Sequence, residues 1–210
     1  MAIISTYSGR IFTADWKTEL LQAGFCYQVS VGGIAAGGAE TVITGGGSGT
    51  TIDTDQPELA VGVPAGKFLI PLEFHFSGRY IPAADDEVES VILFTDRTQN
   101  IPAPDSGTST VETPSPLLDG GDAFSGYAQS AVTADITDPV LSDWLVFKTV
   151  QAELHTAVGV DALRLEADWE PQIPHLLKGP CSVIGAWGGT AAVSGACSFV
   201  FAEVDSERFE

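Results

Sequence analysis

A run of ten residues, 67–76, alternates between apolar side chains and a mixed set over its whole length. Its apolar members occupy every second position: Phe68, Ile70, Leu72, Phe74 and Phe76. In an extended chain all of them project to one face, while Lys67, Leu69, Glu73 and His75 project to the other, which is the pattern of a half-buried β-strand. Pro71 has no N–H to donate to a neighbouring strand. We therefore expect this strand to lie at a sheet edge or to contain a β-bulge.

Further strand-like segments are separated by clusters of Gly, Pro or Asp. They are 25–31, 88–95, 144–154, 162–169, 181–187 and 196–204. Segment 144–154 also admits a helix, since Asp138 and Pro139 can cap one, but its Val, Phe and Thr residues favour a strand. About eight strands without alternating helices predict an all-β antiparallel sandwich. A single jelly roll fits this pattern better than a seven-stranded immunoglobulin sandwich, whose Cys-Trp-Cys spacing is absent.

One short helix is expected near the N-terminus, within residues 13–24. Thr13 can cap its first turn, Asp15 lies early in it, and Gly24 can end it. The apolar residues of this segment are Trp16, Leu20 and Leu21.

The chain has 210 residues, which is enough for one sizeable hydrophobic core, so we expect a single domain over 1–210. Its expected parts, in chain order, are an N-terminal arm with the helix (1–24), strands (25–95), a long loop or insertion (96–142), strands (143–204) and a tail (205–210). The 96–142 segment is rich in Pro, Ser and Thr and is expected to be a long excursion without a strand ladder. Loops of this length in compact domains often form interfaces or sites.

Acidic residues outnumber basic ones by 28 to 9, which gives a formal net charge of -19. Such a field repels nucleic acid and anionic membranes, so no direct nucleic-acid binding is expected. The hydrophobic fraction of 44% is too high for a disordered acidic chain. The dispersed acids fit either a high-salt environment or solubility at high local concentration. No transmembrane segment and no leader peptide are expected, because no long apolar stretch and no signal-like N-terminus occur.

Three cysteines without CxxC spacing argue against a zinc ribbon or a disulfide scaffold: Cys26, Cys181 and Cys197. The end of the chain is expected to form a hairpin around Gly189 and Gly195. With Gly189 at its centre, Cys181 and Cys197 lie opposite one another, within reach of a disulfide. A chain without a secretory signal favours buried free thiols instead, and thiols in apolar strands are inert.

Metal sites of the cupin kind need several His and one Glu from neighbouring strands. Glu73 and His75 share a strand face, but an HxH pair is absent and His155 and His175 lie far along the chain, so we favour a solvent-facing pair. Three carboxylate clusters lack the spacing of a calcium loop and fit turns instead: Asp53 with Asp55, Asp85 with Asp86 and Glu87, and Asp119 with Asp122. We predict no metal ligands and no cofactor.

Two carboxylates, Glu166 and Asp168, share one face of the 162–169 strand, beside Arg164 and Trp169. Such a pair fits a glycosidase or a sugar-binding surface, but an exposed, charged strand face predicts the same residues. No GxSxG motif occurs, and Gly-Gly-Ser-Gly at 46–49 is typical of a flexible loop. The glycine clusters also lack a nucleotide-binding pattern. We therefore assign no catalytic residues and do not expect an enzyme.

Both faces of the expected terminal hairpin are poor in charge. One face is suited to a sandwich core: Cys181, Val183, Trp187, Phe199 and Phe201. The other is small and smooth: Ser182, Ile184, Ala186, Ala196, Ser198, Val200 and Ala202. A smooth apolar face is suited to packing against another subunit or against the long loop. We therefore expect assembly through this outer face and the 96–142 segment.

The stretch Leu59-Ala-Val-Gly-Val-Pro-Ala-Gly-Lys-Phe-Leu-Ile-Pro-Leu-Glu-Phe is followed by a strand, a long variable loop and a Gly-rich segment ending Phe-Val-Phe-Ala-Glu. In texture, over about residues 57–204, this resembles jelly-roll structural proteins of icosahedral viruses, in particular single jelly-roll capsid proteins of tailless archaeal and bacterial viruses. The resemblance implies a self-assembling shell subunit of the virion, made in the host cytoplasm, with other virion proteins as partners and without cofactor or active site. An acidic, low-lysine version would suit a halophilic host. The missing basic N-terminal arm departs from shells that bind their genome directly and would fit an internal membrane beneath the shell.

Two other classes stay open. A phage decoration or fibre-head module would use the same sandwich to bind a shell or a host glycan. A carbohydrate-active enzyme would need paired carboxylates in a cleft. Particles in negative-stain micrographs would favour the shell subunit, whereas a glycan-binding monomer would favour the other two classes.

Overall fold

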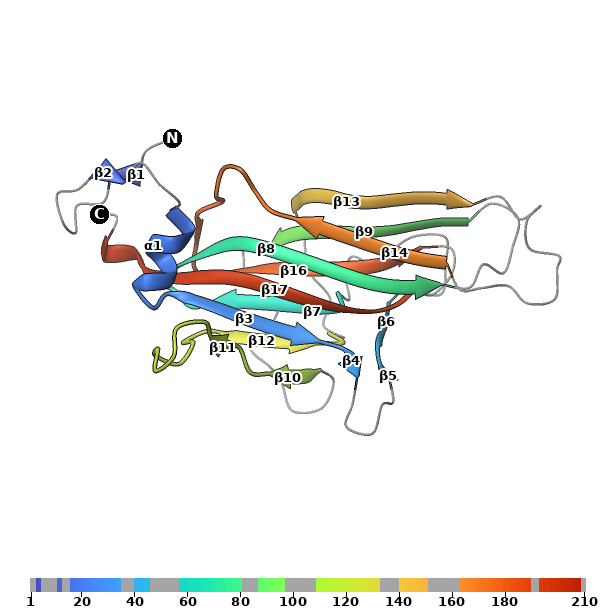
Figure 1. Cartoon of the computed structure of the whole chain (residues 1–210), viewed down its shortest axis with the longest axis horizontal. Coiled ribbons are helices and arrows are strands. Elements are labelled where there is room, and N and C mark those ends of the chain that lie inside the picture. Colours follow the sequence, from blue (N-terminus) through green and yellow to red (C-terminus); the bar gives the residue numbers. More distant parts are fainter. Residues whose placement is uncertain are drawn as a thin grey trace.

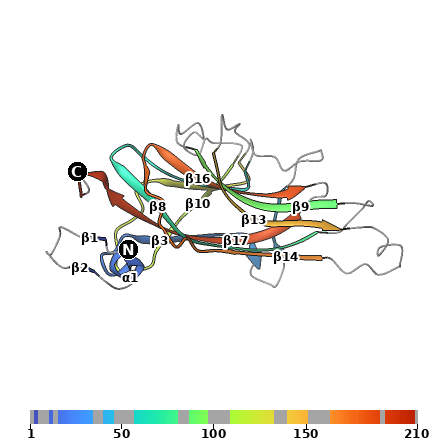
Figure 2. The same ribbon diagram turned by 90° about the horizontal axis from the view of Figure 1, so that it is seen from above.

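The computed structural model describes ten stretches of the chain. They are 3–4, 11–12, 16–34, 40–45, 57–80, 87–96, 109–132, 140–150, 163–189 and 193–208. These residues form two antiparallel sheets that face one another as a β-sandwich, with one short α-helix near the N-terminus (Figures 1 and 2). The predicted fold class is therefore confirmed.

The six-stranded sheet contains, in spatial order, β10 (Thr110–Glu112), β12 (Tyr127–Ser130), β7 (Leu59–Val63), β16 (Cys181–Gly189), β9 (Glu87–Asp96) and β13 (Val140–Val150). The seven-stranded sheet runs β11 (Ser115–Pro116), β3 (Cys26–Val31), β17 (Val193–Asp205), β8 (Lys67–Tyr80) and β14 (Leu163–Trp169), while β15 (Leu177–Lys178) pairs with β8 and β6 (Ile43–Gly45) pairs with β17. Outside the sandwich lie β1 (Ile3–Ile4) with β2 (Ile11–Phe12), β4 (Gly33–Ile34) with β5 (Glu40–Thr41), helix α1 (Trp16–Gln22) and the 3-10 turn η2 (Ser206–Arg208).

Eight of these strands follow the order of a jelly roll. The row β3-β17-β8-β14 of one sheet faces the row β7-β16-β9-β13 of the other. Along the chain, each of these strands is followed by one in the opposite sheet, except that β9 and β13 are antiparallel neighbours in the same sheet. This is the double Greek key of a single jelly roll. Its long β8 and β17 lie side by side at the centre of their sheet (Figure 1).

The main core lies between the two sheets and is rich in aromatic rings. Phe74 and Phe76 of β8, Phe199 and Phe201 of β17, and Trp187 of β16 are all buried in it. The rings of Phe76 and Trp187 lie 4.9 Å apart between centroids, so they join the two sheets. Contacts of this kind add to the area burial that stabilises a sandwich. The face of the terminal segment that was predicted to fill the core is confirmed.

A β-bulge at Leu72 divides strand β8 into two halves. Val200 pairs with Glu73, but the next residue of β17, Phe201, pairs with Pro71, so Leu72 is the extra residue. The predicted bulge is confirmed, whereas an edge position is wrong because β8 lies between β17 and β14. Successive side chains of a strand point to opposite faces, so one extra residue reverses which face each side chain before it occupies.

The consequence is that the five alternating apolar residues do not share one face. Phe74 and Phe76 point into the main core, but Ile70 and Leu72 belong to a second cluster on the outer face of the sheet. There they pack with Cys26, Ala202 and Val204, and with four partly buried residues: Trp16, Leu20, Phe25 and Val200. Leu69, which was expected on the outer face, lies in the main core instead. The predicted single inward face is therefore wrong, because periodicity alone does not reveal the bulge residue.

Helix α1 covers this outer cluster. Its apolar Trp16 and Leu20 pack onto the cluster, while Leu21 stays exposed. Gly24 follows the helix with a positive φ of 77° and donates its N–H to the Leu21 carbonyl, the conformation for which glycine is suited at a helix end. The predicted helix and its end are confirmed, whereas the capping residues Thr13 and Asp15 lie outside the described residues.

The predicted terminal hairpin is wrong. Strands β16 and β17 do not pair but lie in opposite sheets, and Gly195 sits inside β17 rather than in a turn. Cys181 pairs in register with Val63, whereas Cys197 pairs with Val31 and Phe76, so these cysteines do not oppose each other across a ladder. The local sequence resembles a hairpin because Gly and small residues separate two apolar runs, but a jelly roll sends its last two strands to different sheets.

The smooth outer face expected for that hairpin is therefore split between the two sheets. Ser182, Ile184 and Ala186 of β16 are fully buried in the six-stranded sheet. On β17, Ala202 is buried in the cluster beneath α1, while Ala196, Ser198 and Val200 are half-buried. The expectation of one free assembly face is wrong, because the chain itself already covers much of this surface.

The 96–142 segment is not free of strands where the structure describes it. Strands β10 and β12 extend the six-stranded sheet beyond β7, and β11 extends the other sheet beyond β3. The segment thus closes both sheets along one side of the sandwich (Figure 1). The expected strands in 25–31, 88–95 and 162–169 are confirmed as β3, β9 and β14. The expected strand 144–154 corresponds to β13, which begins at Val140, and residues 151–154 lie outside the described residues.

Candidate functional site

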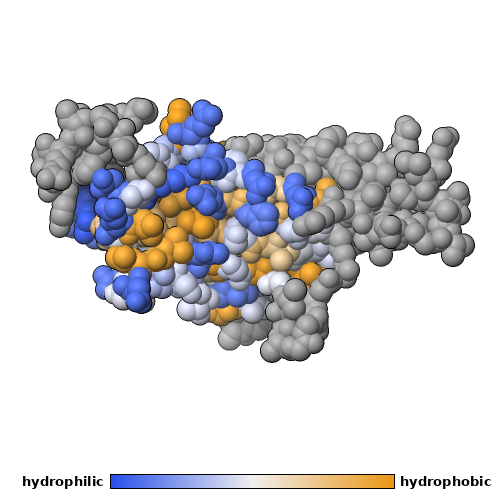
Figure 3. Space-filling view, in the orientation of Figure 1, coloured by the Kyte–Doolittle hydropathy of each residue, from blue (hydrophilic) through white to orange (hydrophobic). Residues whose placement is uncertain are grey.

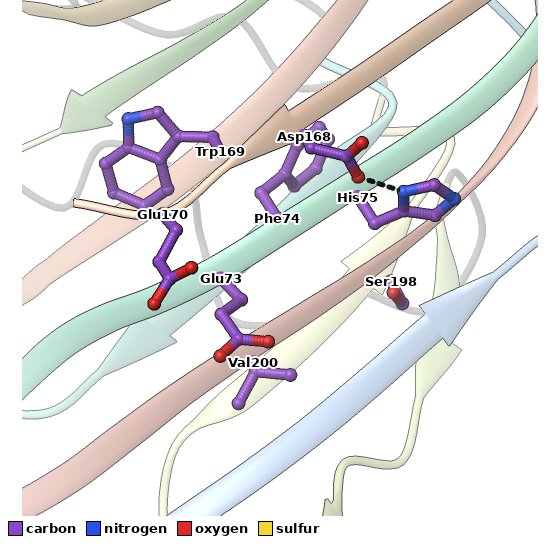
Figure 4. A pocket seen from close by; sticks show the side chains of 8 residues that line it. All are labelled: Glu73, Phe74, His75, Asp168, Trp169, Glu170, Ser198 and Val200. Atoms are coloured by element: carbon purple, nitrogen blue, oxygen red, sulfur yellow. Dashed lines mark hydrogen bonds and ion pairs between the residues drawn. The ribbon is translucent and has the colours of Figure 1, made fainter. Parts of the chain in front are cut away.

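A shallow groove crosses the outer face of strands β8, β14 and β17 (Figure 4). Its volume is about 330 Å³. The residues that line it are Glu73, Phe74, His75, Asp168, Trp169, Glu170, Ser198 and Val200. Three of these are acids, and they lie near the point where the bulge turns β8. The groove is therefore an acidic surface feature on a rigid sheet.

Three polar residues form a row across the groove. Ser198 of β17 pairs in register with His75 of β8, and His75 pairs with Asp168 of β14. The His75 Nδ1 and the Asp168 carboxylate are hydrogen-bonded to each other (Figure 4). Register pairing in adjacent strands thus brings together residues that are far apart in the sequence.

This row contains the side-chain types of a Ser-His-Asp nucleophilic site, yet the surroundings differ from such a site. The side chains of His75 and Asp168 are 53% and 81% exposed, so water reaches both. A hydrolytic site also needs donors aimed at a developing oxyanion in a water-excluded space. Ser198, His75 and Asp168 lie in three paired strands, so their backbone groups take part in the hydrogen bonding between these strands and are not aimed at a ligand. The geometry therefore fits binding better than nucleophilic catalysis.

Lys17 of helix α1 contacts two of the carboxylates that line the groove. Its Nζ lies 2.5 Å from Glu170 Oε1 and 3.4 Å from Glu73 Oε1, and it also donates to the Leu72 carbonyl. Both carboxylates are largely exposed, so each ion pair contributes little to stability by itself. Together, the two ion pairs of Lys17 connect helix α1 to β8 beside the bulge and to Glu170 at the end of β14.

The paired carboxylates predicted on β14 do share a face. Glu166 and Asp168 are both exposed on the outer side of the strand, while Leu165 and Ala167 point into the core. Trp169 belongs to the core side, where it packs partly against the main core. A carboxyl group that acts as a general acid is usually desolvated, and neither of these two is. The side chain of Arg164 lies outside the described residues.

The other sequence candidates do not converge with this groove. Glu73 and His75 form a solvent-facing pair on β8, as we favoured. His175 is exposed beyond β14, where its ring meets that of Trp169 edge-on at 6.3 Å between centroids. Asp119 and Asp122 are exposed on the opposite edge of the sheet. The remaining candidates lie outside the described residues: Asp53, Asp55, Asp85, Asp86, His155, the side chain of Glu87 and the loop 46–49.

The cysteines are buried free thiols, the alternative that we favoured. Burial raises the pKa of Cys26 to about 11, with a smaller contribution from the nearby charge of Glu73. Burial likewise raises the pKa of Cys197, helped by the charge of Glu58. A thiol that stays protonated is a poor nucleophile and a poor metal ligand.

A second polar cluster lies at the start of β8. Lys67 Nζ is 3.1 Å from Glu203 Oε1 and 2.7 Å from Asp205 Oδ1. The buried Glu203 also accepts hydrogen bonds from the backbone N–H of Ser125, at 2.9 Å, and from its hydroxyl. The hydrogen bond to Asp205 raises the pKa of Lys67 and lowers the pKa of Asp205. This cluster ties the loop after β11 to β17, so we assign it a structural role.

Among the described residues, no group of three or more His, Cys, Asp and Glu side chains is arranged to hold a metal ion. Within the same stretches, no helix is long and apolar enough to cross a membrane. Comparison of the chain with protein-family models, curated proteins and solved structures finds no match. Sequence reasoning missed the cross-strand row at Ser198, because only the register of β17 against β8 places this residue beside His75.

Proposed function

We infer that this protein is a shell-building structural subunit, a capsid protein that assembles with further copies of itself in a virion. The observation that carries the proposal is the strand order, in which β3-β17-β8-β14 faces β7-β16-β9-β13. A jelly roll of this kind is the architecture of many viral capsid domains, although a fold can host other functions. The textural resemblance of residues 57–204 to such proteins adds to it.

The surface supports the same proposal. Several large apolar side chains are exposed at the edges and loops of the sandwich, among them Val111, Leu117, Ile173 and Leu176. Apolar side chains gain when a neighbouring subunit removes them from water, by roughly 25 cal/mol for each Å². A shell repeats each contact many times, so individually weak contacts are sufficient.

A second candidate function is glycan binding by a decoration or fibre-head module. The groove favours it, because three carboxylates, an imidazole and the partly buried Trp169 are among the residues that line it. Open, polar grooves with an aromatic side chain suit ligands with many hydroxyl groups. A carbohydrate-active enzyme is a weaker form of this proposal, since the carboxylates of Glu166 and Asp168 are both solvated.

The test is to purify the protein and follow its mass by sedimentation at 0.1 M and about 1 M salt, with negative-stain microscopy of each sample. Closed particles or regular capsomers are the expected result. A monomer under all conditions that binds a glycan array, with binding lost in His75→Ala, would replace the shell proposal with the glycan-binding one. Release of sugar that stops in Glu166→Gln/Asp168→Asn would replace it with the enzyme.

A further inference from the structure

The connection between β14 and β15, taken together with the two residues of β15 itself, displays apolar side chains to water. In this segment, here named the 171–178 loop, Ile173 is 67% and Leu176 is 51% exposed. The next residue, Leu177, is buried in the main core and pairs in register with Leu69 of β8. The loop is therefore anchored at its end while its apolar residues remain outside. A surface held in place before binding loses less conformational entropy when a partner arrives.

The charge of this loop differs from that of the rest of the chain. Residues 171–202 contain no Asp or Glu, although the chain carries 28 acids and a net charge of -19. The ionisable side chains of the loop are His175 and Lys178, and both are exposed. The 171–178 loop is thus apolar with a basic component, and an acidic partner surface would complement it.

A matching surface exists elsewhere on the same molecule. Leu117 and Leu118, which follow β11, are 42% and 40% exposed, and Leu21 at the end of α1 is 36% exposed. Leu118 lies against the helix end, since its Cδ2 would be 3.4 Å from a Cβ placed on Gly24. The exposed Asp119 follows directly. We name this surface the 117–122 patch, and apolar colour gathers at this end of the molecule in Figure 3.

The patch carries two exposed carboxylates, those of Asp119 and Asp122. Burial raises the pKa of the nearby Tyr27, and the charges of Glu203 and then of Asp122 add to this effect. The backbone of the patch is fixed, because Leu117 donates its N–H to the Cys26 carbonyl and Ser125 is bound by Glu203. The patch therefore presents leucine side chains beside carboxylates on an ordered backbone.

The two surfaces lie at opposite edges of one sheet. Strand β11, which leads into the patch, is at one edge of the seven-stranded sheet, and β14, which leads into the loop, is at the other. In Figure 1 they lie on the lower and upper sides of the sandwich. One copy therefore cannot bring its own loop to its own patch. Two copies placed side by side in the same orientation can bring the loop of one to the patch of the next.

We propose that the 171–178 loop of one copy docks onto the 117–122 patch of the next copy, in a head-to-tail contact that builds the assembly. Ile173 and Leu176 pack against Leu117 and Leu118, while Lys178 faces the aspartates. A contact between two different surfaces repeats from copy to copy and closes into a ring or shell when the rotation allows it. This inference rests on the proposed self-assembly, and a second copy is its partner because the chain carries both complementary surfaces.

The experiment uses two full-length variants, Ile173→Asp in the loop and Leu118→Asp in the patch, with Val42→Asp as the control. Val42 is also an exposed apolar residue, 38% exposed, but lies between β5 and β6. Sedimentation at high salt should show that each of the first two raises the concentration needed for assembly by about tenfold or more. The control should assemble like the wild type. Unfolding midpoints of all variants show whether each is folded.

Mixing the two variants distinguishes a head-to-tail contact from other geometries. Each mixed pair retains one intact loop and one intact patch, so Ile173→Asp with Leu118→Asp should give a 1:1 dimer that neither variant forms alone. Assembly of both variants like the wild type, or a mixture that stays monomeric while the wild type assembles, would overturn the inference and leave the shell proposal standing. A wild type that stays monomeric at all salt concentrations would overturn both.

Discussion

Gly78 and Gly195 pair directly across strands β8 and β17, and the ring of Phe76 fills the space that their missing side chains leave. A Cβ at Gly78 would lie 2.4 Å from Cζ of Phe76, and a Cβ at Gly195 would lie 2.4 Å from its Cε2. The same ring meets Trp187 of the opposite sheet. The glycine pair therefore lets the ring lie close to the backbone of its own sheet while it contacts the other.

Gly195→Ala should therefore destabilise the fold by overpacking, by about 1 to 3 kcal/mol. The measurement is the free energy of unfolding in urea. A smaller side chain at position 76 should make room for the new methyl group, so the double variant Gly195→Ala/Phe76→Leu should cost less than the sum of the two single variants. Strict additivity would show that the ring and the glycine are not coupled.

Phe74→Ala should destabilise the protein by about 3 to 5 kcal/mol, because the ring is 1% exposed and its removal leaves a cavity in the main core. Ile173→Ala is the matched control, since this side chain is largely exposed and its loss should change stability by less than about 0.5 kcal/mol. Both values come from denaturant unfolding. Equal effects of the two variants would contradict the assignment of Phe74 to the core.

The ion pair of Lys67 and Asp205 should make stability depend on pH at both extremes. The pKa of Asp205 is lowered from 3.8 by the hydrogen bond from Lys67, so its contribution is present above pH 3.8 and is lost as the pH falls further. The pKa of Lys67 is raised from 10.5, so its contribution is present below pH 10.5 and is lost as the pH rises further. The difference in unfolding free energy between wild type and Lys67→Met should be level between these limits and shrink beyond them. A difference that does not change with pH would exclude this linkage.

Added salt should raise the unfolding temperature. The chain has a net charge of -19, and repulsion between like charges is screened as the Debye length falls from about 10 Å at 0.1 M to about 3 Å at 1 M. Sodium chloride and potassium chloride should act alike if screening is the cause. An unfolding temperature that is unchanged or lower at 1 M would show that charge repulsion does not limit stability.

The three thiols should react with a thiol reagent only when the protein opens. Cys26, Cys181 and Cys197 are buried, and burial raises the pKa of Cys26 and Cys197. Labelling by Ellman's reagent should therefore be slow in the native state and immediate for all three in denaturant. Rapid labelling of the native protein, or fewer than three reactive thiols in denaturant without reductant, would contradict this description.

The alternation of apolar and polar residues was sufficient to predict the β-sandwich, because such alternation over several residues indicates a half-buried strand. The sequence pattern also placed helix α1 and every strand of the jelly roll except β7, whereas the short flanking strands were not expected. It misjudged the glycines at the end of the chain: Gly195 was interpreted as part of a turn, although it makes room for Phe76 inside β17. Glycine marks both situations equally, and only the partner across the ladder separates them.

Only part of the candidate groove could be predicted from the sequence. The shared faces of Glu73 with His75, and of Glu166 with Asp168, follow from the period of two along each strand. That β8 and β14 are neighbours in register, and that Ser198 completes the row, depends on the topology of the jelly roll. Strand order in a sheet is a long-range property, and alternation within one strand carries no information about it.

Because of the bulge at Leu72, the number of residues between the two halves of β8 decides which side chains face the main core. Deletion of this one residue would reverse the two faces of the preceding half of the strand, Lys67–Pro71. Ile70 would then point toward the main core and Leu69 toward the helix. A change of two residues at the same place would leave the sides as they are. Variation in length here is therefore tolerated only in even steps, so the spacing between Phe68 and Phe74 should stay even in any functional variant of this protein.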